Sequence, residues 1–109
     1  MSDVDTVPAA EVPAEAQILD VREAYEYEVG HAPGAVHIPV DEIPVRFDAE
    51  LDPDVDYYVI CRTGGRSIQI AQWLTVQGYS VFFVGGGYDA WVTAQRPLAS
   101  VTGEEPRIL

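Results

Sequence analysis

Four short apolar runs dominate the sequence and limit the folds open to it. They occupy residues 18–21, 35–38, 57–60 and 81–84. Their apolar residues are mostly continuous rather than alternating, which is typical of strands buried on both faces of a parallel sheet. The segments between the runs are long enough for the crossover connections that parallel neighbours require. The runs therefore predict a parallel sheet.

Helices are expected between and after these strands. The clearest one extends over residues 65–77, where apolar residues recur on one face. A second follows the three glycines at 85–87 and ends before Pro97, and a shorter one lies within residues 41–51. Strands that alternate with helices predict an α/β layer fold.

The length and composition set further bounds. A chain of 109 residues fits one domain, and we expect a lead-in with a short strand or turn at 1–11, a folded domain at 12–98 and a tail at 99–109. The net charge is −12, and all six cations are arginine. Such a balance argues against nucleic-acid and anionic-membrane partners, because both require a basic surface.

The expected location is the cytoplasm. The acidic N-terminus lacks the pattern of a secretory signal, and no apolar stretch approaches the length of a membrane span. The single cysteine, Cys61, cannot form an internal disulfide, which fits a reducing compartment.

The segment of residues 61–67, called the Cys61 loop below, carries the chemistry. Cys61 directly follows a predicted buried strand, at the strand end where open α/β sheets bind ligands. Gly64 and Gly65 permit positive φ, so that backbone N–H groups can converge on one point, and the helix that follows adds unpaired donors. Such a site stabilises a thiolate, the nucleophilic form of cysteine. The alternatives are a buried structural cysteine and a tight turn without a ligand.

Three segments resemble the rhodanese family of sulfurtransferases. They are the run from Leu19 to Glu23 with Tyr27 and residues 30–39, the Cys61 loop, and residues 85–91. The resemblance extends over residues 12–98. It implies a central parallel sheet with helices on both faces and thiosulfate-type sulfur transfer through a cysteine persulfide. The region before Ile18 is short, so the first helix of the family is expected to be reduced or missing, which puts the first strand in doubt.

The resemblance also assigns roles within the Cys61 loop. Cys61 is the nucleophile and sulfur carrier, and the residues expected to bind the substrate are Arg62, Thr63, Gly64, Gly65, Arg66 and Ser67. Arg62 is either a contact for an anionic donor or a solvated surface residue. Arg66 either binds substrate or braces the loop through a carboxylate such as Asp20, and bracing is favoured. Ser67 is expected to be a helix cap or first-turn residue, and its hydroxyl is a candidate contact for the sulfur.

Other polar residues are assigned to the scaffold. Asp20 and Arg22 end a strand on the same rim and are expected to support the site, because structural ion pairs are common. His31 and His37 lie in a motif that the family uses structurally. No metal is expected, since one cysteine and two scattered histidines match no ligand spacing. No cofactor is expected either, and the glycines at 85–87 are interpreted as a turn.

Two other functions remain open at this point. The first is a phosphatase or arsenate reductase of the same fold. The dual-specificity phosphatases that resemble this chain carry five residues between cysteine and arginine, whereas Cys61 and Arg66 are separated by four. An arsenate reductase would also need a reductant thiol, and the sequence has no second cysteine. A non-enzymatic module, or a sulfur carrier dedicated to one partner, is the second alternative. The expected partners are a small donor such as thiosulfate and a thiol, cyanide or protein acceptor.

Overall fold

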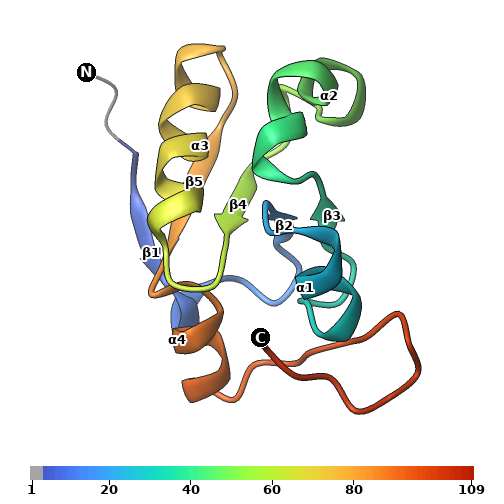
Figure 1. Ribbon diagram of the computed structural model, residues 1–109. Coiled ribbons are helices and arrows are strands. Elements are labelled where there is room, and N and C mark those ends of the chain that lie inside the picture. The colour runs from blue at the N-terminus through green and yellow to red at the C-terminus, as the bar shows by residue number, and fades with distance from the viewer. Residues whose placement is uncertain (1–3) are drawn as a thin grey trace.

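The structure, a computed structural model, describes residues 4–109 and contains a five-stranded parallel sheet (Figure 1). The strand order is β1-β5-β4-β2-β3. The strands are β1 (Thr6–Pro8), β2 (Gln17–Asp20), β3 (Val36–His37), β4 (Tyr57–Ile60) and β5 (Val81–Gly85). The four apolar runs correspond to β2, β3, β4 and β5, which confirms the predicted parallel sheet. Residues 1–3, which belong to the expected lead-in, lie outside the described part of the chain.

The three expected helices are present. They are α2 (Ile43–Glu50), α3 (Gly65–Val76) and α4 (Gly87–Thr93), with two short 3-10 turns, η1 (Ala9–Glu11) and η2 (Val40–Glu42). Only η1 lies between β1 and β2, so the first helix of the family is reduced, yet β1 still pairs in parallel with β5. A fourth helix, α1 (Ala24–Val29), was not expected from the sequence; its N-terminus is closed by a capping box between Glu23 and Glu26.

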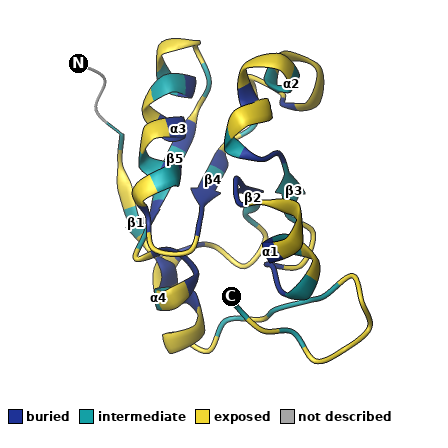
Figure 2. Ribbon diagram, viewed as in Figure 1, coloured by how far each residue is buried: buried dark blue, intermediate teal, exposed yellow. Residues whose placement is uncertain are grey.

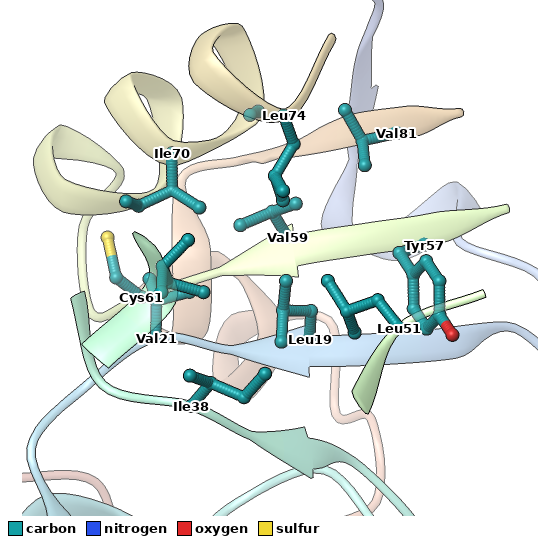
Figure 3. Close-up of a cluster of buried hydrophobic side chains, with 12 residues drawn as sticks. Leu19, Val21, Ile38, Leu51, Tyr57, Val59, Cys61, Ile70, Leu74 and Val81 are labelled. Atoms are coloured by element: carbon teal, nitrogen blue, oxygen red, sulfur yellow. The ribbon is translucent and has the colours of Figure 1, made fainter. Parts of the chain in front are cut away.

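Helices cover both faces of the sheet, as expected. On one face α2 and α3 pack over Leu19, Val59 and Val81, and Figure 3 shows this core with Cys61 at the end of β4. On the other face α4 and η1 pack over Ile18, Ile60 and Val84. In Figure 2 the buried residues line the sheet, whereas the outer sides of the helices are exposed. None of the helices within residues 4–109 is both long enough and apolar enough to cross a membrane.

The carboxyl ends of β2 and β4 meet at one edge of the sheet. Asp20 is the register partner of Ile60, so the residues that follow β2 lie beside Cys61. The C-terminal segment returns to the same end of the molecule (Figure 1). It pairs Ala99 with His31 in an antiparallel bridge, and the Arg107 amide donates to the Val29 carbonyl.

Candidate active site at the Cys61 loop

The sulfur of Cys61 lies inside a small ring of hydrogen-bonding groups. The Gly64 amide lies 3.1 Å from Sγ, the Ser67 amide 3.3 Å and the Ser67 hydroxyl 3.2 Å. The Cys61 residue is only 1% exposed. Both amides belong to the junction where the loop enters α3, and backbone N–H groups in the first turn of a helix have no partner within the helix. The arrangement directs donors and the positive end of a helix dipole at one sulfur atom.

Ser67 is fully buried and has two partners. Its Oγ lies 3.2 Å from the Gly64 carbonyl as well as 3.2 Å from Sγ. In the thiol form of Cys61, the S–H donates to Ser67 and the Ser67 hydroxyl donates to the Gly64 carbonyl. In the thiolate form, the hydroxyl is free to turn and donate to the sulfur. Ser67 therefore satisfies both protonation states of the cysteine.

The two loop glycines differ in backbone conformation. Gly64 has φ 131°, and a Cβ on it would lie 2.9 Å from the Phe83 ring. Gly65 is the first residue of α3, its φ is not positive, and a Cβ there would meet no atom within 4 Å. Gly64 thus adopts the positive φ that glycine permits, whereas Gly65 does not, because Gly65 already belongs to the helix.

Arg66 braces the loop against α1. Its guanidinium donates to both oxygens of Glu26, at 2.7 and 3.1 Å. Burial raises the pKa of Glu26, but the hydrogen bonds from Arg66 and from the Glu23 amide outweigh it and lower that pKa below its usual value. The Glu26 hydrogen bond in turn raises the pKa of Arg66. The carboxylate that binds Arg66 is thus Glu26 and not Asp20, which the sequence suggested.

Arg62 and Thr63 are exposed, as is Gly65. The Arg62 side chain is 51% exposed, and its Nε lies 3.5 Å from the carboxylate of Asp89 in α4. The amides of Tyr88 and Asp89 donate to the carbonyls of Cys61 and Arg62, at 2.9 and 3.0 Å. The first turn of α4 therefore holds the backbone of the loop in place through these two hydrogen bonds.

Asp20 and Arg22 form a fully buried ion pair beside the site. Arg22 donates to both oxygens of Asp20, at 3.1 and 2.8 Å, and to the Gly30 carbonyl at 2.6 Å. The Tyr88 hydroxyl donates to Asp20 at 2.9 Å, and the Tyr88 ring lies 4.2 Å from the Arg22 guanidinium. Burial raises the pKa of Tyr88 well above its ordinary value. The hydrogen bonds of this pair go to the surrounding frame and not to the sulfur, in keeping with a supporting role.

The two histidines both stack on the ring of Tyr27. His31 and His37 both lie against Tyr27, with ring centroids 3.8 and 4.4 Å away. Their ring nitrogens bond to the carbonyls of Tyr27 and Arg22, at 2.6 and 2.7 Å. Within residues 4–109 no three acidic, histidine or cysteine side chains are grouped as a metal site.

Two residues of this site were not found from the sequence. Glu26 lies in a helix that has no clear apolar period, and Tyr88 follows a glycine run that indicated only a turn. The one available signal for Glu26 was the pair of glutamates at 23 and 26, which fits a capping box.

Comparison with known proteins supports a family assignment. The family model described as "Rhodanese-like domain" matches residues 9–94. A Bacillus subtilis relative named "Putative sulfurtransferase YtwF" is 39% identical over 87 residues, which cover 80% of this chain and 84% of that protein. Another from the same organism, "Putative sulfur carrier protein YrkF", is 47% identical over 62 residues, or 57% of this chain.

Some relatives are much longer than this chain. The matched part makes up 33% of YrkF and 27% of the Arabidopsis thaliana "Rhodanese-like/PpiC domain-containing protein 12, chloroplastic", which is 40% identical over 81 residues (71% of this chain).

Solved structures agree with this assignment. A rhodanese-related protein from Thermoplasma volcanium has a TM-score of 0.82 at 28% identity, covering 87% of this chain and 97% of its own. A thiosulfate sulfurtransferase from Pseudomonas aeruginosa has a TM-score of 0.77 at 30% identity, covering 97% of this chain and 22% of its own. With a parallel sheet, a donor-lined cysteine loop and a family model that matches most of its length, this chain belongs to the rhodanese-like domain family.

Proposed function

We propose that the protein is a sulfurtransferase that carries a sulfane sulfur on Cys61. The Cys61 thiolate attacks the outer sulfur of thiosulfate, the S–S bond of the donor breaks, and sulfite leaves with the bonding electron pair. Cys61 then holds a persulfide whose outer sulfur bears the negative charge. Attack on that sulfur by cyanide or a thiolate restores the Cys61 thiolate and yields thiocyanate or a new persulfide.

The observation that carries this proposal is the ring of two amide donors and one hydroxyl group around one sulfur atom. The Gly64 amide, the Ser67 amide and the Ser67 hydroxyl all lie 3.1–3.3 Å from Sγ. Preorganised donors at such distances stabilise negative charge where it develops. The names of the relatives, a sulfurtransferase and a sulfur carrier, agree with this chemistry.

The acceptor must be another molecule. Cys61 is the only cysteine in the chain, so no second thiol of this chain is present to resolve the persulfide. A thiol, cyanide or a protein sulfur acceptor meets this requirement. The single cysteine also fits a reducing compartment such as the cytoplasm, which remains the expected location.

Intact mass spectrometry tests the proposal. Thiosulfate should add the mass of one sulfur atom to the wild-type protein, and cyanide should remove it and release thiocyanate. The variant Cys61→Ser should keep its fold, monitored by circular dichroism, and should gain no sulfur. Thiocyanate production by Cys61→Ser at the wild-type rate would refute the role of Cys61.

The same preparation separates the alternatives. A sulfur carrier dedicated to one partner would load sulfur but release it slowly to cyanide and small thiols. A phosphatase would hydrolyse aryl phosphates, which we do not expect, because the ring of donors encloses one sulfur atom and a phosphoryl group requires room for three equatorial oxygens.

A further inference from the structure

Each arginine of the Cys61 loop faces a carboxylate. Arg66 makes two hydrogen bonds to Glu26, and Arg62 lies 3.5 Å from Asp89. Arg62 and Arg66 stand at the entrance to the Cys61 sulfur, called the mouth of the loop below, and each positive charge is offset by one negative charge. The net charge of the whole chain is −12. A strongly anionic donor meets little uncompensated positive charge there.

The Arg66 pair is the better ordered of the two. The Glu26 side chain is only 8% exposed, and its Oε1 also accepts the Glu23 amide at 3.1 Å. Glu26 is thus fixed by its own helix and in turn fixes the Arg66 guanidinium through a two-point contact. The Arg62 pair is a single longer contact between exposed side chains, which contributes little in water.

Arg66 stands close to the reacting sulfur. It lies in the first turn of α3, next to Ser67, whose amide and hydroxyl contact Sγ. Its side chain is 39% exposed and is therefore partly open to solvent. Because Ser67 contacts the sulfur and Arg66 is its neighbour in the chain, the Arg66 charge contributes to the electrostatic field at the mouth of the loop. The charge that Glu26 cancels is therefore one that a bound donor would experience.

Building on the sulfur transfer proposed above, we propose that Glu26 is a positioning and specificity-determining residue. It holds Arg66 at the mouth of the Cys61 loop and cancels its charge. The site then favours sulfane donors that carry one negative charge or less, such as organic persulfides and thiosulfonates, over the thiosulfate dianion. Glu26 acts through Arg66 and does not contact the substrate itself.

Two donors of matched chemistry separate charge from reactivity. Methanethiosulfonate has a methyl group where thiosulfate has an anionic oxygen, so it carries one charge instead of two. The Cys61 thiolate attacks its outer sulfur, the S–S bond breaks, and methanesulfinate leaves with the electron pair in place of sulfite. The product on the protein is the same persulfide.

The central experiment measures kcat/KM for both donors, with cyanide as acceptor, in the wild type and Glu26→Gln. The glutamine oxygen still accepts a hydrogen bond from Arg66, but the negative charge is gone. We expect kcat/KM for thiosulfate to rise about fivefold, mainly through KM, and that for methanethiosulfonate to change less than about twofold. Glu28→Gln is the matched control, because it removes one charge from the exposed side of α1 and should leave the donor ratio unchanged.

Two further variants test positioning and the sign of the effect. Glu26→Ala removes the anchor of Arg66, so kcat should fall for both donors, and Glu26→Gln should rescue it. Arg66→Gln leaves the Glu26 charge unopposed and should shift the donor ratio against thiosulfate, opposite to Glu26→Gln. Arg66→Gln also keeps the proposal testable if the Glu26 variants do not fold.

The outcomes separate this inference from the proposed function. If the wild type takes up sulfur through Cys61 but Glu26→Gln changes the donor ratio no more than Glu28→Gln, the inference is wrong and the sulfur transfer stands. An Arg66→Gln variant with an unchanged ratio also overturns it. If the wild type takes sulfur from neither donor, the proposed function itself fails.

Discussion

At the scale of single residues, the reactivity of this site depends on a few hydrogen bonds to one sulfur. Two of the three groups around Cys61 Sγ come from Ser67, through its amide and its hydroxyl. The amide is set by the path of the backbone, but the hydroxyl depends on the side chain at position 67. Since hydrogen bonds to charged groups contribute more than those to neutral groups, this hydroxyl should matter most in the thiolate and persulfide states.

We therefore expect Ser67→Ala to slow sulfur uptake from thiosulfate about tenfold, which corresponds to the loss of one hydrogen bond to a charged sulfur. Single-turnover loading, followed by intact mass, measures this rate. The matched control is Thr75→Ala, which removes a hydroxyl that donates to the Ala71 carbonyl in the same helix. Equal rates in the two variants would show that the Ser67 hydroxyl does not act on the sulfur.

At the scale of elements, the loop is supported by the start of α4 as well as by α3. Gly87 has φ 57°, and a Cβ on it would overlap the carbonyl oxygens of Cys61 and Arg62. The close approach allows the amides of Tyr88 and Asp89 to bond to those carbonyls. A glycine at position 87 thus brings two elements together behind the nucleophile, and the geometry of the site depends on a residue outside the loop.

Gly87→Ala should separate α4 from the loop. We expect a loss of about 1–3 kcal/mol in the free energy of unfolding, because an added methyl group in a packed region forces the backbone to shift, together with loss of most sulfur-transfer activity. Gly65→Ala is the control within the loop itself. Its Cβ has open space and helical dihedrals, so stability should stay the same or rise slightly. Urea unfolding measures both, and a stable, active Gly87→Ala variant would contradict the packing argument.

At the scale of the whole molecule, the net charge of −12 opposes the approach of an anionic sulfur donor. The chain has 18 acidic residues against six arginines. Four of the arginines (Arg22, Arg46, Arg62 and Arg66) lie within 4 Å of a carboxylate. The long-range field is therefore negative, and it repels anions before they reach the short-range influence of the loop.

Salt should consequently raise the second-order rate of sulfur uptake from thiosulfate. The Debye length falls from about 30 Å to about 10 Å as ionic strength rises from about 0.01 to about 0.1 M, which screens the repulsion. Stopped-flow kinetics over this range measures the effect, and methanethiosulfonate, with half the charge, should show a smaller rise. A rate that falls with salt would mean that the loop arginines outweigh the net charge.

Much of the fold could be predicted because it depends on local patterns. The runs that became β2, β3, β4 and β5 are continuous in the sequence, and α3 has an apolar stripe and begins at a glycine. By contrast, α1 is six residues long and holds mainly glutamate and tyrosine, so no apolar period indicates it. The capping box between Glu23 and Glu26 is a local signal but a short one, and the contacts that α1 makes with other segments cannot be read from its own residues.

The sequence by itself therefore determined the parallel α/β architecture and the place of Cys61 at a strand end before a glycine turn and a helix. Those features follow from short-range chemistry: apolar runs, a backbone that needs glycine at position 64, and unpaired amides at a helix start. Only the tertiary structure decided which carboxylate each arginine meets. Arg66 binds Glu26, 40 residues away in the sequence, whereas Asp20 forms its ion pair with Arg22. Such pairs depend on how β2, α1 and α3 are placed around the sheet edge, because charge attracts at a distance without specifying a partner.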